Sequence, residues 1–436
     1  MPDMTTCLPP GPPLPAALQT LLFFRCPLPF VRGCQQRYGD VFTLRLVFEG
    51  QVVYLADPEG IAELFSRDGR EAHAGEANSV LEPVTGAHSV LLLDRDAHLR
   101  ERRLLAPSFH GEAIGELETL ARTATERELA RWGDEAVVAM RPAMQRITFE
   151  IICKAVLGID DPARREELLS ALGPVFDIPP SVLVPPLQVD LGPLTPWRRF
   201  QRAMKRLDRM LYGLIAERRA GAPRPDILGM MLAADVEGGG RLSDKMVRDE
   251  LVTLLLAGHE TTATALAWAL ERLAHHQTIL AEVRQSLRAG EPELLEAVAA
   301  ETLRLRPVVM DVARRLSVPL ELCGYRLGAG TVVMPAIYLV HRDQRRYADP
   351  GAFYPQRFLE QRPSREVWLP FGGGRRRCLG AALAQMELRV VLGAVLAQYL
   401  VEPCSRRPEG MRLRGLTLAP ARGAKLAVRR KPLANS

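Results

Sequence analysis

One cysteine in this chain follows three glycines and three arginines, in the run Phe371-Gly-Gly-Gly-Arg-Arg-Arg-Cys378-Leu-Gly380. The glycines allow backbone conformations that are closed to other residues, so the chain can pass close to a flat ligand. Cys378 falls just before or within the first turn of a predicted helix, where unpaired N–H groups and the helix dipole favour a thiolate. Such a thiolate could ligate haem iron, pushing electron density onto the metal and promoting O–O cleavage, while nearby N–H groups moderate that effect.

Other chemistries compete for the same loop. A phosphate-binding loop would require G-x-x-x-x-G-K-[ST], which the sequence lacks. A cysteine phosphatase loop would place Arg six residues after the cysteine, where this chain has Ala384. An ordinary buried cysteine remains open from the loop alone.

A second group of reactive side chains interrupts a long apolar segment. Residues 247–273 are apolar on almost every face, which predicts a buried central helix. Gly258 and Thr261 should weaken its hydrogen-bond ladder and produce a local bulge. Burying the carboxylate of Glu260 costs free energy unless it has a partner, so its position inside an apolar segment indicates a functional role. A zinc protease motif is excluded because H-E-x-x-H would need His where Ala263 stands.

Two further charged pairs have helical spacing. Glu301 and Arg304 are three residues apart and share one helix face. His98 and Arg102 are four apart, so both can face one carboxylate edge of a ligand.

The elements that must position these groups are mostly helical. Short strands are predicted in residues 39–56 with a turn at Glu49-Gly50, and again in 312–335. Helical patterns dominate from 94 to 280, apart from a proline-rich stretch at 173–196 and a glycine run at 238–240, and a long apolar helix follows at 379–400. We therefore expect a mainly α fold with a small β lobe, as one domain over 1–436. Residues 1–38 form a proline-rich extended lead-in and residues 39–436 the catalytic core.

Composition narrows the function classes. The chain has 436 residues, 47% of them apolar, and a net charge of +6, which is too mild and too poor in interleaved aromatics for nucleic-acid binding. Its seven scattered cysteines form no C-x-x-C pair, so neither a zinc knuckle nor a disulfide framework is indicated. Residues 14–30 are too interrupted to span a membrane. We expect a cytoplasmic monomer without an integral membrane segment; weak peripheral membrane contact is the alternative.

The sequence resembles the cytochrome P450 family over residues 39–428. Four elements carry the resemblance, and they follow one another in the family's order. From the N-terminal side they are Ala257-Gly-His-Glu-Thr-Thr262, Glu301-Thr-Leu-Arg304, Tyr354-Pro-Gln-Arg-Phe358 and the run from Phe371 to Gly380 with Gly374 and Arg376. The E-x-x-R spacing alone is uninformative, but the cysteine run is specific. The resemblance implies a triangular helical domain, with haem b buried between the central apolar helix and the cysteine-loop helix.

The resemblance also implies residue roles. Cys378 is the axial ligand, and Phe371, Gly372, Gly380 and Ala257 contact the haem. The bulge at Gly258 makes room for dioxygen, Thr261 hydrogen-bonds dioxygen or its water, and Glu260 supplies protons. Arg357 joins Glu301 and Arg304 in a buried ion network that supports the cysteine loop, although Gln356 stands where a Glu often precedes this arginine. The propionates contact His98, Arg102, Arg376 and Arg314, with Arg315 as a rival for the last position.

The resemblance places the substrate walls in aliphatic segments. These segments are residues 80–93, the region 174–196, Leu254, Ala257 and Thr261, Val308, Val309, Asp311 and Val312, and Leu416, Thr417 and Leu418. They imply a hydrophobic substrate such as a fatty acid, terpenoid, steroid or macrolide-like molecule. Asp311 either binds a substrate amine or hydroxyl or, as we favour, caps local backbone and faces Arg314.

We expect electrons to come from a separate protein, because the sequence shows no flavin domain after the cysteine loop and its helix. Four arginines could form a basic dock for a ferredoxin or flavodoxin served by an NAD(P)H reductase, and they are Arg100, Arg103, Arg375 and Arg377. The predicted function is a haem-thiolate monooxygenase that uses O₂. A peroxide-driven peroxygenase of the same fold and a non-catalytic haem sensor or carrier remain alternatives, and the Glu260-Thr261 pair favours the first.

Overall fold

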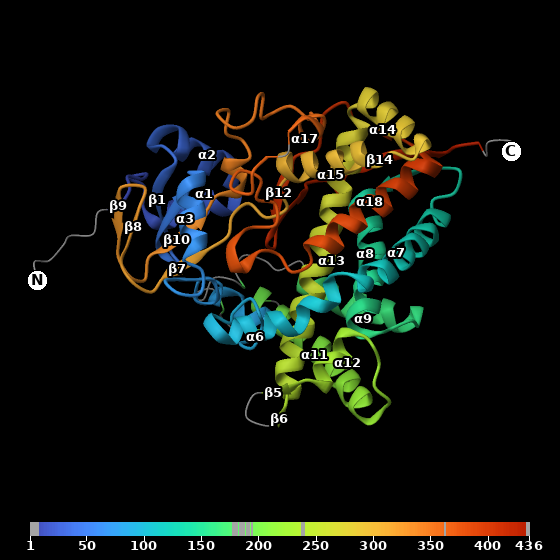
Figure 1. Ribbon diagram of the computed structural model, residues 1–436, viewed down its shortest axis with the longest axis horizontal. Coiled ribbons are helices and arrows are strands. Elements are labelled where there is room, and N and C mark those ends of the chain that lie inside the picture. Colours follow the sequence, from blue (N-terminus) through green and yellow to red (C-terminus); the bar gives the residue numbers. More distant parts are fainter. Residues whose placement is uncertain are drawn as a thin grey trace, which may run out of the picture.

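The computed structural model describes residues 8–432 except 177–181, 183–187, 189–191, 193–194, 237–239 and 362. Helices form the larger part of the molecule and a β-rich lobe lies at one side of them (Figure 1). The expected mainly α fold with a small β lobe is therefore confirmed. The region 174–196, which was expected to form part of the substrate walls, and the glycine run at 238–240 lie largely outside the described residues.

The helices, with their bounds, are α1 (Ala16–Arg25), α2 (Pro27–Tyr38), α3 (Pro58–Ser66), α4 (Ala74–Ala77), α5 (Glu82–Thr85), α6 (Arg95–Leu105), α7 (Glu112–Ala130), α8 (Met140–Leu157), α9 (Pro162–Phe176), α11 (Pro196–Ala220), α12 (Ile227–Ala233), α13 (Asp244–Ala274), α14 (Gln277–Ala289), α15 (Glu293–Leu305), α16 (Ile337–Val340), α17 (Arg357–Glu360) and α18 (Ala381–Gln398). Short 3₁₀ turns lie at Ser79–Leu81, Ala106–Phe109 and Gly374–Arg376.

The strands, with their bounds, are β1 (Val41–Leu46), β2 (Gly50–Leu55), β3 (Ala72–His73), β4 (Glu135–Ala139), β5 (Asp235–Val236), β6 (Gly240–Arg241), β7 (Arg314–Leu316), β8 (Leu320–Leu322), β9 (Tyr325–Leu327), β10 (Val332–Pro335), β11 (Tyr399–Pro403), β12 (Met411–Arg414), β13 (Thr417–Pro420) and β14 (Lys425–Arg430). The largest sheet has the order β1-β2-β10-β7-β3, and a second has the order β11-β14-β4. The remaining strands pair two by two.

The β lobe is built around the predicted hairpin of β1 and β2. The two strands pair antiparallel from Val41 opposite Leu55 to Leu46 opposite Gly50, and β10 then adds parallel to β2. Gly50 has a φ of +77°, a conformation that glycine adopts without strain, so the tight turn falls there. The strand-like pieces expected in 312–335 are β7 to β10. β4, which lies inside the region that we expected to be helical, was not predicted.

The expected extended lead-in over residues 1–38 is wrong for its second half. Residues 16–25 and 27–38 form α1 and α2, which contact each other and β1. Pro27 does not break α2 because it occupies the first helical turn, where its missing N–H has no intrahelical partner in any case. Residues 1–7 lie outside the described part of the chain.

α13 is the predicted buried central helix, and almost every residue from Val247 to Ala274 is buried. It packs chiefly against α8 and also contacts α18, α15 and α11. In Figure 1 it runs through the middle of the fold, between the β lobe and the helices around α7 and α8. The expected bulge near Gly258 is absent, because α13 is continuous α-helix from Asp244 to Ala274.

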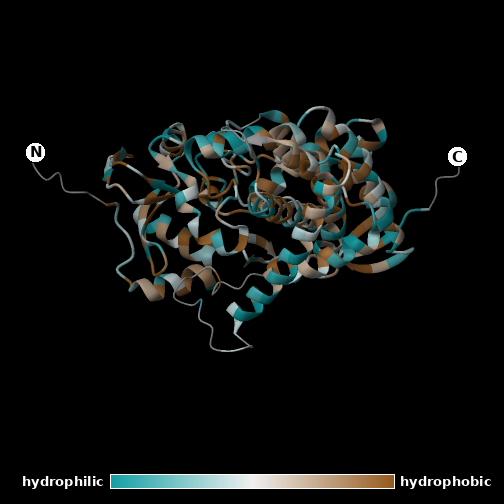
Figure 2. Cartoon of the chain, turned by 90° about the horizontal axis from the view of Figure 1, so that it is seen from below, coloured by the Kyte–Doolittle hydropathy of each residue, from teal (hydrophilic) through white to brown (hydrophobic). Residues whose placement is uncertain are grey.

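α18 is the one described helix that is long and apolar enough to cross a membrane, but 56% of its residues are buried inside the protein. It contacts α7, α13 and α15. In Figure 2 hydrophobic and hydrophilic residues alternate along the helices and do not separate into one apolar band. The apolar sequence of α18 is accounted for by its place in the core.

Candidate active site

A cavity of about 360 Å³ lies between α13 and the loop that precedes α18. One wall is the α13 segment from Thr253 to Ala265, and the opposite wall is the loop from Pro370 to Gly380. The lining is mainly apolar, apart from a thiol and a group of basic side chains. This arrangement suits a flat, largely apolar ligand that carries anionic groups at one edge.

Cys378 presents its side chain to this cavity. Its backbone N–H donates to the carbonyl oxygen of Phe371 at 2.9 Å, which closes the loop. Gly374 has a φ of +64°, and a Cβ there would come within 2.2 Å of an oxygen of Asp68, so this position requires glycine.

The surroundings of the thiol act on its acidity in opposite directions. Burial raises the pKa of Cys378 above its usual value, whereas the N–H of Gly380 and the charges of Arg102 and Arg377 lower that pKa. The expectation that the helix end alone would favour a thiolate is therefore only partly correct.

The four residues expected near the propionates all line this cavity, namely His98, Arg102, Arg314 and Arg376. Arg376 donates to Val90 and Asp94, the latter at 2.5 Å. Burial, reinforced by Arg376 and Arg102, lowers the pKa of His98 to about 4. His98 is therefore a neutral hydrogen-bonding group at pH 7 and not a cation.

The structure separates Arg314 from its rival Arg315. Arg314 is buried, lines the cavity and forms two hydrogen bonds with Asp68, at 2.5 and 3.1 Å. Arg315 pairs instead with Glu49 and does not line the cavity. Arg314 is thus the arginine positioned toward the ligand.

Thr261 faces the cavity, whereas Glu260 faces away from it. The Thr261 hydroxyl donates to the carbonyl oxygen of Ala257 at 2.6 Å, as expected for a threonine inside a helix. Glu260 is 8% exposed and accepts hydrogen bonds from Arg141 at 2.7 Å and Gln145 at 2.6 Å. The cost of burying its carboxylate is offset by partners on α8, which sequence spacing did not reveal.

Glu301, Arg304 and Arg357 form the expected ion network. Arg304 is fully buried and pairs with both oxygens of Glu301, at 2.6 and 2.8 Å, while Arg357 approaches Glu301 at 3.3 Å. Arg304 also donates to the carbonyl oxygen of His341 at 2.8 Å. The His341 ring then accepts from the N–H of Leu369 at 2.9 Å, two residues before the cysteine loop begins. Hydrogen bonds through His341 and Leu369 thus connect the ion network to the cysteine loop.

The predicted substrate walls divide into three groups. Leu254, Ala257, Val308, Val309 and Val312 line the cavity next to Cys378. Two others, Asp311 and Leu416, line a neighbouring cavity instead.

Thr417 and Leu418 line neither cavity, so their assignment as wall residues is wrong. The Thr417 hydroxyl donates to the Arg414 carbonyl oxygen, and the Leu418 N–H donates to Val308 at 2.8 Å. The buried Trp268 donates to the carbonyl oxygen of Leu418 at 2.9 Å, so β13 supports the wall from behind.

Asp311 also differs from our preferred expectation. It does not face Arg314, whose guanidinium is taken by Asp68. Its carboxylate accepts a hydrogen bond from the hydroxyl of Tyr54, 257 residues earlier in the chain, at 2.8 Å.

α13 and α8 approach each other very closely at the cavity. A Cβ on Gly258 would lie 2.5 Å from the Cδ1 atom of Ile152, which is buried and also lines the cavity. Gly258 is thus required for helix packing and not for a bulge.

The helical fold with its β lobe, the thiol loop facing an apolar central helix, and the buried E-x-x-R pair define a haem-thiolate oxygenase. The sequence model for the family described as Cytochrome P450 matches residues 9–427. The chain belongs to the cytochrome P450 family and is a haem-dependent monooxygenase.

Similar proteins agree with this assignment over almost the full length. The chain is 42% identical to cytochrome P450 135B1 of Mycobacterium tuberculosis and 38% identical to its cytochrome P450 135A1, covering 97% of this chain in both cases and 91% and 95% of those proteins. The solved structure of a cyanobacterial protein, CYP120A1 with retinoic acid bound, is 25% identical and superposes with a TM-score of 0.86 over 98% of this chain and 100% of that one.

Proposed function

We propose that this monooxygenase binds haem b with Cys378 as axial ligand and oxidises an apolar small molecule held against α13. The observation that carries this proposal is that the Cys378 thiol, the Thr261 hydroxyl and several aliphatic side chains line the same cavity. When bound, haem supplies the reductive activation of dioxygen and the transfer of one oxygen atom to a C–H or C=C bond.

The basic group around the cavity fits the two carboxylates of haem. Arg102, Arg314 and Arg376 present guanidinium groups that can form charge-assisted hydrogen bonds with propionates. His98 is neutral and adds an N–H donor. The acids Asp68 and Asp94 hold Arg314 and Arg376 in place from the other side.

We assign proton transfer to Thr261 and Glu260, of which Thr261 lines the cavity and Glu260 faces away from it. The Thr261 hydroxyl is at the cavity surface and can give up its bond to Ala257 to hydrogen-bond dioxygen or a water. Glu260 is next to Thr261 in the sequence, but Arg141 and Gln145 hold its carboxylate by hydrogen bonds. It can exchange protons only after these hydrogen bonds loosen. The Arg141–Glu260 ion pair would control when protons are transferred, because the carboxylate is released only when Arg141 moves.

The aliphatic walls favour an apolar substrate. Retinoic acid, bound in the cyanobacterial structure, is one molecule of that kind, with a long hydrocarbon and one charged end. The names of the mycobacterial relatives give no substrate.

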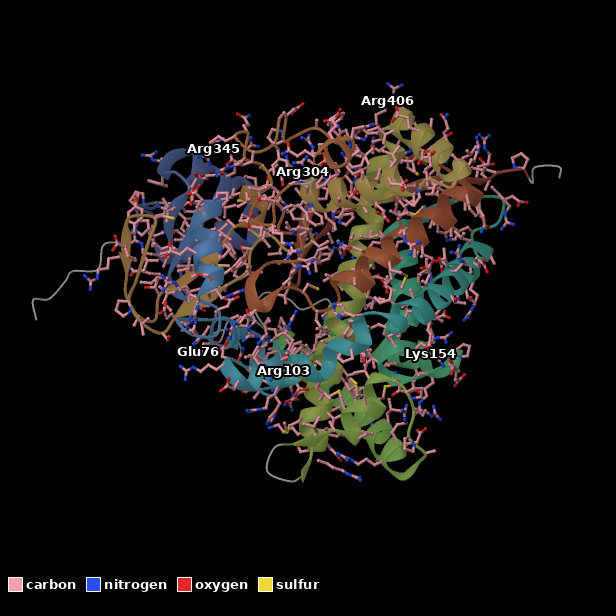
Figure 3. The ribbon with its side chains drawn as sticks, viewed as in Figure 1. Glu76, Arg103, Lys154, Arg304, Arg345 and Arg406 are labelled. Carbon is pink, nitrogen blue, oxygen red and sulfur yellow. The ribbon has the colours of Figure 1, made fainter. Side chains whose placement is uncertain are left out.

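The cysteine side of the molecule fits an acidic electron donor such as a ferredoxin or flavodoxin. Arg375 and Arg377 in the loop are exposed, as are Arg100 and Arg103 on α6. The charge of Arg377 acts on both Arg102 and Cys378, so α6 and the loop adjoin. Figure 3 shows Arg103 at the outer side of α6. A basic surface near the iron ligand would steer an acidic partner toward it.

The ligand assignment is tested with the Cys378→His variant. The haem-loaded, reduced protein with carbon monoxide should show the absorption band typical of thiolate ligation, and the variant should lose this band because imidazole replaces sulfur. Cys404→Ser, at an exposed cysteine outside the cavity, should keep it. Retention of the band by Cys378→His would mean that another residue ligates the iron.

A screen of apolar compounds for a shift of the haem absorption band, followed by product analysis, would identify the substrate. A peroxygenase would form product with peroxide as efficiently as with O₂ and an electron donor. A sensor or carrier would shift its spectrum and form no product. The cavity position of the Thr261 hydroxyl favours the monooxygenase.

A further inference from the structure

A second cavity of about 380 Å³ adjoins the first on the side of the β lobe. Its walls come from α1, the β1–β2 hairpin, residues 309–314 and the β12–β13 turn. Leu91, Val309 and Val312 line both cavities. The two cavities are therefore adjacent, and these side chains form the boundary between them.

Asp311 is a partly buried acid that lines this second cavity without a basic partner among the described residues. Its carboxylate accepts one hydrogen bond, from the hydroxyl of Tyr54, and no other hydrogen bond or ion pair reaches it among the described residues. The two arginines at the boundary are already occupied, Arg314 by Asp68 and Arg376 by Asp94. The Asp311 carboxylate thus has one neutral partner and is reached from the cavity, so a cation that enters the cavity can form a charge-assisted hydrogen bond or ion pair with it.

The charge state of Asp311 agrees with such a role. Burial raises the pKa of Asp311 to about 6, against a smaller lowering by the Tyr54 hydroxyl, so most molecules carry the charge above neutral pH. Tyr54 stays neutral because burial, followed by Asp311, raises its own pKa well above the usual value. The remaining charged groups that face this cavity are Arg314, Arg376 and Glu49, each of which has a partner of opposite charge.

Aromatic rings line the same cavity as Asp311. Phe23 packs edge-on against Tyr54, with ring centroids 6.4 Å apart, and against Phe24 at 5.6 Å. Phe24 in turn lies 5.6 Å from Phe48. The three phenylalanines line the cavity together with Asp311. Aromatic faces attract organic cations, by about 0.5 to 2 kcal/mol, and quaternary ammonium groups are recognised in this way.

We propose that the second cavity binds the positively charged amine end of an elongated apolar substrate, with Asp311 as its counter-ion and Phe23, Phe24 and Phe48 around it. The hydrocarbon part then extends past Val309 and Val312 into the first cavity, where it is oxidised. Asp311 is thus a specificity-determining residue, and this inference rests on the proposed function. It selects an amine over a fatty acid, because a carboxylate would be repelled.

The test compares two probes of equal chain length on the haem-loaded full chain, decyltrimethylammonium and 1-decanol. The quaternary nitrogen has no lone pair, so it cannot ligate the iron and any binding must use other contacts. The dissociation constants follow from the shift of the haem absorption band. Asp311→Asn should weaken binding of the ammonium probe at least 10-fold and change that of decanol less than twofold. Asp160→Asn, at an exposed acid paired with Lys154, is the matched control and should change neither.

A second measurement needs no variant and covers the case in which Asp311→Asn does not fold. The charge of decyltrimethylammonium is independent of pH, so its affinity for the unchanged protein should fall as the pH drops through about 6 and Asp311 is protonated. The affinity for decanol should stay level. Equal losses for both probes in Asp311→Asn, or an ammonium affinity that does not vary between pH 5 and 8, would overturn the inference.

The proposed function has its own outcome. If decanol still shifts the haem band while the ammonium probe shows no dependence on Asp311, the apolar-substrate proposal stands and only the amine preference fails. If neither probe shifts the band, both fail.

Discussion

Glu301→Gln tests the link between the buried ion network and the cysteine loop. Glu301 accepts hydrogen bonds from Arg304 at 2.6 and 2.8 Å, from the N–H of Tyr354 at 2.9 Å and from Arg357 at 3.3 Å. Glutamine keeps the size but offers one acceptor oxygen, and its amide N–H₂ must face a guanidinium. Arg304, which is fully buried, would then lack a counter-ion.

The expected cost follows from this burial. Breaking a buried ion pair by removing one charge typically destabilises a protein by about 3–5 kcal/mol, whereas an exposed pair contributes about 0–1 kcal/mol. A protein whose total stability is about 5–15 kcal/mol would lose a large share of it. Glu217→Gln is the matched control, because Glu217 pairs with Arg164 at 2.6 Å but is half exposed.

Urea unfolding of the haem-loaded variants, followed by circular dichroism and by the haem absorption band, measures both effects. Glu301→Gln should unfold at markedly lower urea and should release haem before the helices unfold, since the route from Arg304 through His341 to Leu369 supports the loop. If Glu301→Gln were no less stable than Glu217→Gln, or lost haem only with the helices, the reasoning would be refuted.

Three further predictions concern catalysis, electron transfer and pH. Thr261→Ala should lower the fraction of electrons recovered as product several-fold, measured as product formed per NAD(P)H consumed, whereas Thr123→Ala, at an exposed threonine with the same backbone bond, should not. Arg377→Glu should slow reduction by a ferredoxin and make the rate less salt-sensitive in stopped-flow traces. Arg406→Glu, at an exposed arginine that lies at the top of Figure 3 while the labelled Arg103 lies in its lower part, should leave the rate unchanged. Burial, followed by Arg141, lowers the pKa of His259 to about 3. The unfolded chain therefore binds a proton at His259 below about pH 6.5 that the folded chain rejects, so this residue contributes a fall in stability of about 1.4 kcal/mol per pH unit from 6.5 toward 3. His259→Gln should lower the slope measured in acid denaturation by that amount, while the contributions of His98 and His341, whose pKa values burial lowers to about 4 and about 3, should remain.

Local spacing predicted the parts of the site that lie on one element. The cysteine loop, the Glu301–Arg304 pair and the central helix each occupy a short run of sequence, so residue type and period were sufficient. The proline-rich lead-in over residues 1–38 was expected to be extended, whereas Pro27 lies in the first turn of α2, where a helix tolerates proline.

Contacts between distant segments could not be read from spacing. Glu260 meets Arg141, 119 residues earlier, and Asp311 meets Tyr54, 257 residues earlier. These partners depend on how α13 packs on α8 and on how residues 310–313 cross the β lobe. The assignment of Thr417 and Leu418 as wall residues failed for the same reason, since spacing did not reveal that the backbone of Leu418 bonds to Val308 and to the Trp268 ring.

The close approach of Gly258 to Ile152 has an evolutionary consequence. A methyl group at position 258 would require the Ile152 side chain to shift or to become smaller, so substitutions at the two sites should be coupled among relatives. Since Ile152 also forms part of the cavity wall, each such paired change would reshape the space beside Thr261 without altering any reactive group. One helix contact thus offers a lineage a route to new substrates that leaves its chemistry intact.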